Sequence, residues 1–137
     1  MKLNNKTWLL LIVFPLAFIC CRKSSTGNGT LHTVSLYQCS DHIAGKTGDY
    51  ICFDSLVTDS RCPVGGICIW YGYTEIRVSY HESGNIHRFN MSLPNNMPGT
   101  AVNDTVINGT KIIFTKLDPY PGTGGSVDTT ATFSVTP

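Results

Sequence analysis

The chain has 137 residues, in which ten Lys and Arg face nine Asp and Glu, together with six cysteines. This near balance of charge, with no basic patch, excludes the usual electrostatic attraction to nucleic acid. The length suits a single domain, and no internal repeat divides it.

The N-terminal segment predicts export. Lys2 and Lys6 lead into an apolar block over residues 8–19, which is shorter than the roughly 20 residues that a membrane-spanning helix needs. An ordinary signal-peptidase site requires a small residue before the cut, and Ile19 is too bulky for that position.

Two adjacent cysteines, Cys20 and Cys21, follow the apolar block. This arrangement resembles a bacterial lipoprotein signal, in which a cysteine after a short apolar and small-residue box is acylated and becomes the first mature residue. We expect Cys21 to be the acceptor, because it follows small Cys20, whereas Cys20 itself follows Ile19; Cys20 stays the alternative. The resemblance implies a signal peptide over residues 1–20 and a lipid anchor in the bacterial cell envelope, at the outer membrane, either periplasmic or surface-exposed. Several acyl chains, palmitate among them, would hold such a protein firmly.

A polar stretch rich in Gly, Asn, Thr and Ser comes next, and we interpret residues 21–30 as a flexible tether. The folded domain is then expected over residues 31–137. An ordinary secreted protein with incidental cysteines is the competing interpretation.

Nearly all of this domain has the composition of β-strands. The last segment is the clearest, because Ala131, Phe133 and Val135 alternate with Thr and Ser, as in a half-buried antiparallel strand. The pattern predicts an all-β, antiparallel two-sheet sandwich, Ig-like or of a related Greek-key type, in preference to a closed barrel. Strands are expected over 31–38, 50–57, 67–81, 86–93, 105–108, 111–117 and 129–136.

The domain retains four cysteines, Cys39, Cys52, Cys62 and Cys68, an even set that predicts two disulfides in an exported chain. Two glycines within residues 63–67 allow a tight return, so Cys62 is expected to pair with Cys68. Cys39 and Cys52 then pair by elimination. Zinc is the alternative, but no C-x2-C spacing occurs, and we expect no metal site.

The histidines at 81 and 87 flank a turn and invite a metal hypothesis. Matching the apolar faces of the two strands places Tyr80 opposite His87 and His81 opposite Ile86. The two imidazoles would then lie on opposite faces of the sheet, which speaks against a shared metal. His32 and His42 complete the set of four.

No catalytic set is apparent. The chain has no G-x-S-x-G elbow, and its domain cysteines are expected to be oxidised and therefore unable to act as thiolates. We expect neither an enzyme nor a bound cofactor.

One segment carries a second resemblance. Asp59-Ser60-Arg61-Cys62-Pro63 is followed by Cys68-Ile69-Trp70-Tyr71-Gly72, with Leu117-Asp118-Pro119-Tyr120-Pro121 near the end. These residues resemble small bacterial exported domains and lipoproteins that share a D-S-R-C-P-x4/5-C-x-W-x-G signature. The resemblance covers about residues 50–137 and implies a fold type and a location; Tyr71 stands where a small residue is expected.

Within this segment, Arg61, Pro63 and Trp70 form the candidate binding loop. A guanidinium at Arg61 can span the Asp59 carboxylate and backbone carbonyls, and we expect Trp70 to pack beneath the bridge. Our leading hypothesis is a non-enzymatic surface or periplasmic interaction module with an unknown protein or glycan partner. The alternatives are a protease inhibitor that presents Arg61-Cys62-Pro63 and a small-molecule or metal-binding accessory protein.

Overall fold

The computed structural model describes residues 29–94, 101–124 and 128–137. The predicted signal peptide, both candidate acceptor cysteines and the tether up to residue 28 lie outside the described residues. Seven strands and no helix make up the secondary structure of the described part, which therefore contains no helix that could cross a membrane. The strands are β1 (Thr30–Ser35), β2 (Tyr50–Asp59), β3 (Thr74–Glu82), β4 (Asn85–Leu93), β5 (Asp104–Ile107), β6 (Thr110–Asp118) and β7 (Thr130–Thr136).

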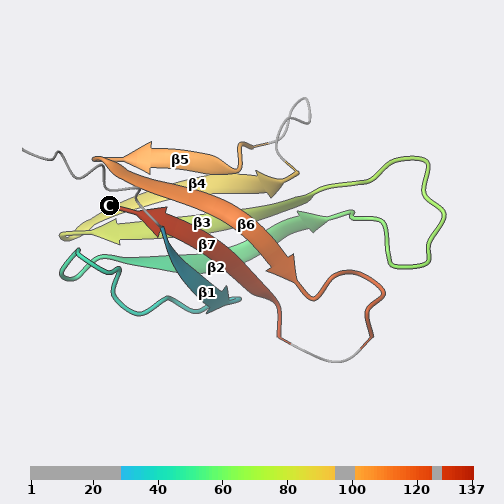
Figure 1. Ribbon diagram of the computed structural model, residues 1–137, viewed down its shortest axis with the longest axis horizontal. Coiled ribbons are helices and arrows are strands. Elements are labelled where there is room, and N and C mark those ends of the chain that lie inside the picture. Colours follow the sequence, from blue (N-terminus) through green and yellow to red (C-terminus); the bar gives the residue numbers. More distant parts are fainter. Residues whose placement is uncertain (1–28, 95–100, 125–127) are drawn as a thin grey trace, which may run out of the picture.

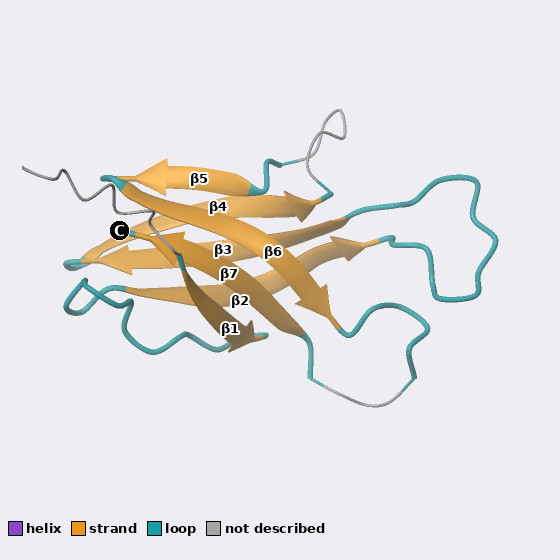
Figure 2. Ribbon diagram, viewed as in Figure 1, coloured by secondary structure: helices purple, strands orange, loops and turns teal. Residues whose placement is uncertain are grey.

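The strands form two antiparallel sheets, which confirms the predicted sandwich (Figures 1 and 2). One sheet has the order β1-β7-β6-β5 and the other the order β2-β3-β4. Thr30 at the start of β1 pairs with Val135 near the end of β7, so the chain enters and leaves the domain at the same end.

Tight two-residue turns join β3 to β4 and β5 to β6. Ser83-Gly84 and Asn108-Gly109 each adopt positive φ at both positions, as two-residue hairpin turns of the I′ type require. Consecutive strands are hydrogen-bonded neighbours within β2-β3-β4 and within β5-β6-β7. In the first sheet β1 lies beside β7, so this sheet also contains a crossover connection between strands distant in the chain.

The core lies between the two sheets. The predicted alternation of buried and outward-facing side chains in β7 is confirmed, because Ala131, Phe133 and Val135 are fully buried. Phe114 on β6 packs against Phe133 with ring centroids 5.8 Å apart. Side chains from both sheets fill the rest of the core: Val34, Ile43, Ile51, Phe53, Ile76, Val78, Tyr80, Met91, Ile112 and Leu117. All these residues follow residue 30, so the core of the described part lies beyond the predicted tether.

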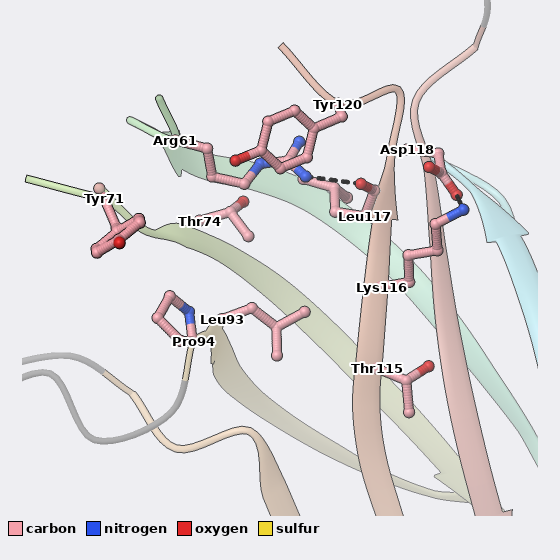
Figure 3. A pocket seen from close by; sticks show the side chains of 11 residues that line it. Arg61, Tyr71, Thr74, Leu93, Pro94, Thr115, Lys116, Leu117, Asp118 and Tyr120 are labelled. Carbon is pink, nitrogen blue, oxygen red and sulfur yellow. Dashed lines mark hydrogen bonds and ion pairs between the residues drawn. The ribbon is translucent and has the colours of Figure 1, made fainter. Parts of the chain in front are cut away.

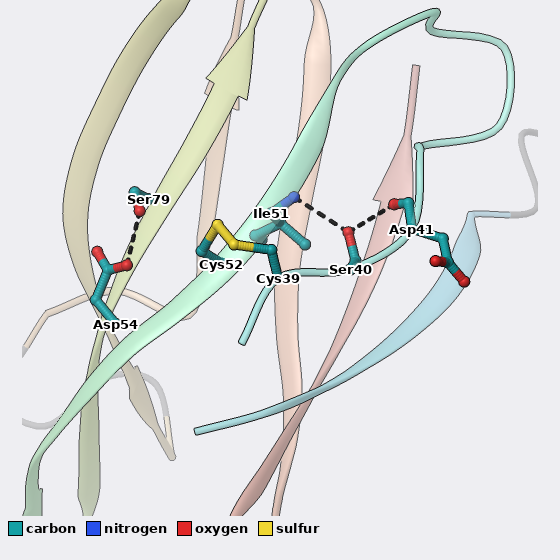
Figure 4. The surroundings of a disulfide bond; sticks show 7 residues. All are labelled: Cys39, Ser40, Asp41, Ile51, Cys52, Asp54 and Ser79. Atoms are coloured by element: carbon teal, nitrogen blue, oxygen red, sulfur yellow. Dashed lines mark hydrogen bonds between the residues drawn. A yellow bond between two sulfur atoms is a disulfide. The ribbon is translucent and has the colours of Figure 1, made fainter. Parts of the chain in front are cut away.

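The predicted bridge between Cys39 and Cys52 is present and fastens the segment after β1 to β2 (Figure 4). Backbone bonds continue on either side of it, from the Ser40 amide to the Ile51 carbonyl and from the Phe53 amide to the Gln38 carbonyl. The Ser40 hydroxyl also accepts a bond from the Ile51 amide. The edge of β2 is thereby covered over its first half.

One predicted strand is shorter than expected. We predicted a strand over 67–81, but β3 begins at Thr74 and residues 67–73 form a loop. Gly72 turns the chain with a φ of 67°, in the left-handed region that other residues avoid. Residues 67–71 therefore leave the sheet although their composition suits a strand.

Candidate functional site: the loop between β2 and β3

The candidate site is the loop over residues 60–73, which projects beyond the strands at the end of the long axis opposite the C-terminus (Figure 1). It contains every residue of the candidate binding loop that we named from the sequence. The predicted bridge between Cys62 and Cys68 closes its outer part. The amide of Cys62 also donates to the carbonyl of Tyr71 at 3.1 Å, so the two ends of the loop pair as neighbouring antiparallel strands do.

Arg61 is the structural centre of this region, as the sequence predicted. Its Nε and Nη2 donate to the two carboxylate oxygens of Asp59, both at 2.8 Å. Nη1 donates to the carbonyl of Leu117 at 2.7 Å, and Nη2 also donates to the carbonyl of Pro119 at 3.0 Å. The side chain of Arg61 is only 10% exposed. The guanidinium therefore joins the β2–β3 loop to the end of β6 (Figure 3).

The segment after β6 completes this support. The ring of Tyr120 lies 4.8 Å from the guanidinium carbon of Arg61, in cation–π geometry (Figure 3). The amide of Val64 donates to the carbonyl of Pro121 at 2.9 Å. Gly122 lies so close that an added Cβ would stand 3.0 Å from the Val64 nitrogen. Tyr120 belongs to the 117–121 segment that accompanies the signature, but the sequence predicted no role for it.

Gly72 closes the base of the loop. A Cβ on this residue would lie 1.7 Å from the carbonyl oxygen of Ser60, which no side chain can tolerate. The amide of Ser60 donates to the carbonyl of Tyr73, and the Ser60 hydroxyl bonds to both backbone groups of Tyr73. The signature glycine is thus required by close backbone contact as well as by its positive φ.

The outer part of the loop carries large apolar side chains that contact water. Ile67 and Ile69 are fully exposed, at 104% and 106% of their reference areas. Trp70 is 63% exposed, so it is not buried beneath the bridge as we expected; its side chain lines a hollow beside the disulfide instead. We call this set the apolar tip; its members are Val64, Ile67, Ile69, Trp70 and Tyr71, with exposures between 63% and 106%.

Two hollows flank the loop. The first, of about 470 Å³, is lined by Arg61, Tyr71, Tyr120 and the ends of β4 and β6 (Figure 3). Its charged groups are already engaged: Arg61 with Asp59, and Lys116 with Asp118 at 2.7 Å. The second, of about 480 Å³, lies beside the disulfide and is lined by loop residues and Tyr120. Neither arrangement places a nucleophile next to a general base.

The structure separates the histidines as the register predicted. Tyr80 lies opposite His87 and His81 opposite Ile86, so the imidazoles occupy opposite faces of the sheet. The His81 ring stacks on Tyr50, with centroids 4.3 Å apart. Across the three described ranges, no three His, Cys, Asp or Glu side chains gather in a way that could hold a metal ion.

A polar cluster lies at the opposite end of the sandwich. Asp49 is buried and accepts bonds from the Tyr80 hydroxyl at 2.9 Å and from the Ser83 amide at 3.3 Å. Burial, reinforced by the nearby Asp49 carboxylate, raises the pKa of Tyr80 to about 12. Glu82 accepts a bond from the Asn108 amide group at 2.5 Å. These contacts hold the β3–β4 and β5–β6 turns together, which is a structural role.

The comparisons with known proteins found no similar protein. No family model matches the chain, and none of the curated proteins or solved structures compared with it matches either. The resemblance to small bacterial exported domains therefore stays a prediction from the signature residues.

Proposed function

We propose that the protein is a lipid-anchored, non-enzymatic interaction module of the bacterial cell envelope that binds its partner through the apolar tip. The observation that carries the proposal is the exposure of five large apolar side chains on one braced loop. Exposed apolar surface costs free energy in water, and contiguous patches of it mark interaction sites.

The bracing supports the same proposal. The disulfide closes the outer part of the loop, and the Arg61 contacts and the Gly72 turn fix its base, while none of them buries the outer side chains. A rigid loop loses little conformational entropy on binding, so more of its contact energy appears as affinity. Trp and Tyr are also the residues most enriched at binding hot spots.

The direction of the loop fits an anchored protein. Thr30 lies beside Val135, at the end of the sandwich away from the apolar tip (Figure 1). A tether that begins at an acylated Cys21 would join the domain at this end. The apolar tip would then point away from the anchor and toward a partner.

The protease-inhibitor alternative receives no support from the loop geometry. An inhibitor must place its Arg side chain in the specificity pocket of the protease, yet the Arg61 side chain is 10% exposed and bonded to Asp59, Leu117 and Pro119. We expect no inhibition of trypsin-like proteases by the intact domain.

Site-specific photocrosslinking in the native cell tests the proposal. A photoreactive residue at position 70 should capture a molecule, whereas one at position 106 should not. Val106 on β5 is the matched control, because it is 63% exposed, as is Trp70, but lies outside the apolar tip. Equal capture at both positions, or none at position 70, would contradict the assignment of the tip as the binding surface.

A further inference from the structure

The apolar tip lies in a run of the chain without charged side chains. Residues 62–74 contain no Asp, Glu, Lys or Arg. The charged groups next to this run are paired with one another: Arg61 with Asp59, and Lys116 with Asp118. An apolar phase can therefore receive the tip without the high cost of desolvating an unpaired charge.

From these contacts we propose that the apolar tip inserts into the surface of a phospholipid bilayer. The proposal rests on the proposed function and names the partner of the same surface. Because the apolar tip lies at the opposite end of the sandwich from the predicted anchor, the bilayer that it enters would be a different membrane from the one that holds the acyl chains. Trp70 and Tyr71 would lie at the headgroup level, where amphipathic rings are favoured, and Ile67 and Ile69 would reach the acyl boundary.

The composition of the apolar tip favours a lipid bilayer over a protein as its partner. The side chains of Ile67 and Ile69 are fully exposed and carry no polar atom. A typical protein interface carries about ten direct hydrogen bonds and is surrounded by a polar rim. Apart from the Trp70 indole N–H and the Tyr71 hydroxyl, the five side chains of the tip have no polar atom to offer such a rim.

The backbone of the loop is compatible with this position. The amides of Cys62, Val64 and Gly66 already donate to the carbonyls of Tyr71, Pro121 and Pro63. The remaining backbone groups would stay in the hydrated headgroup layer, because interfacial segments enter only about 5–10 Å. Full insertion into the hydrocarbon would leave those groups without partners and is not required.

The fluorescence of Trp70 can report contact of the apolar tip with a bilayer. The chain has two tryptophans, and Trp8 lies in the predicted signal peptide. The chain from Ser24 onward, which holds every described strand, both disulfides and the whole core, therefore has Trp70 as its single tryptophan. Added to vesicles of uncharged (zwitterionic) phosphatidylcholine, it should show a blue shift of Trp70 emission and quenching by brominated acyl chains.

Matched variants locate the contact. Ile69→Ser should weaken vesicle binding at least about tenfold, because it removes the free energy of burying one large aliphatic side chain. Val106→Ser, which changes an exposed apolar residue on β5, should leave binding unchanged. Circular dichroism would confirm that both variants keep the fold.

Three results would overturn the proposal: unchanged Trp70 emission at saturating phosphatidylcholine, equal loss of binding in the two variants, or binding that requires anionic lipid and disappears in high salt. The last result would point to electrostatic attraction, which an uncharged tip does not provide. Capture of a protein at position 70 without vesicle binding would overturn the lipid partner and leave the interaction module standing.

Discussion

Replacement of Arg61 by Met tests whether this guanidinium holds the loop in place. Met keeps an unbranched apolar stem of similar reach but removes every hydrogen-bond donor. The Asp59 carboxylate and the carbonyls of Leu117 and Pro119 would lose their partner at the same time. The disulfide would remain, so its contribution is separated from that of the guanidinium.

The magnitude follows from these contacts. A hydrogen bond to a charged group contributes about 1.5–3 kcal/mol, and two such bonds reach backbone carbonyls here. The side chains of Arg61 and Asp59 are 10% and 19% exposed, so water can replace part of what is lost. We therefore expect the free energy of unfolding to fall by about 3 kcal/mol, the lower end of the range for a broken buried ion pair.

Urea denaturation followed by circular dichroism measures this change, with a lower midpoint and an unchanged slope. Arg61→Lys should fall between wild type and Arg61→Met, because an ammonium group cannot serve a carboxylate and two carbonyls at once. A double-mutant cycle with Asp59→Asn should give a coupling of at least about 1 kcal/mol. A loss below about 1 kcal/mol in Arg61→Met, as for an exposed ion pair, would refute the reasoning.

Three further predictions concern stability. Gly72→Ala should lower the free energy of unfolding by at least about 3 kcal/mol, because its Cβ would overlap a backbone oxygen. Gly84→Ala is the control, with positive φ but open space around it, and should lower the free energy of unfolding by about 1–2 kcal/mol. Equal losses of stability in thermal melts would contradict the clash. The buried Tyr80 hydroxyl has a folded pKa of about 12 against an ordinary 10.0, so its contribution of roughly 3 kcal/mol is complete below pH 10 and is lost as the pH rises to 12. Tyr80→Phe should flatten the stability profile in that window, and an unchanged slope would count against the assignment. Serine at both Cys62 and Cys68, which are six residues apart, should cost about 2 kcal/mol by loop-closure entropy, and a loss above about 4 kcal/mol in urea denaturation would show that the bridge does more than close a loop.

Much of the fold was predictable because it depends on local patterns. The period-2 alternation of Ala131, Phe133 and Val135 fixed which face of β7 is buried. Matching of apolar faces gave the β3–β4 register, with Tyr80 opposite His87. These predictions succeeded because side-chain direction in a strand follows from position alone.

The candidate site was predictable only in part. The role of Arg61 was inferred correctly, since an Asp two residues away and a disulfide next to it restrict what a guanidinium can do. The role of Trp70 was predicted wrongly, because an apolar residue beside a bridge suggested burial. The uncharged run over residues 62–74 was visible in the sequence, but it could not by itself distinguish an exposed loop from a buried strand.

The amino-acid sequence by itself determined the strands, the two disulfides and the face that each strand buries, because these follow from alternation, turn residues and spacing. Only the tertiary structure decided which apolar residues stay in water and which carbonyls receive Arg61, because those depend on segments distant in the chain. Leu117 and Pro119 lie 56 and 58 residues beyond Arg61, and no local pattern links them. Burial depends on what packs against a residue, and the segments that contact this loop, such as Pro121 and Gly122 beside Val64, leave the side chains of the apolar tip largely exposed.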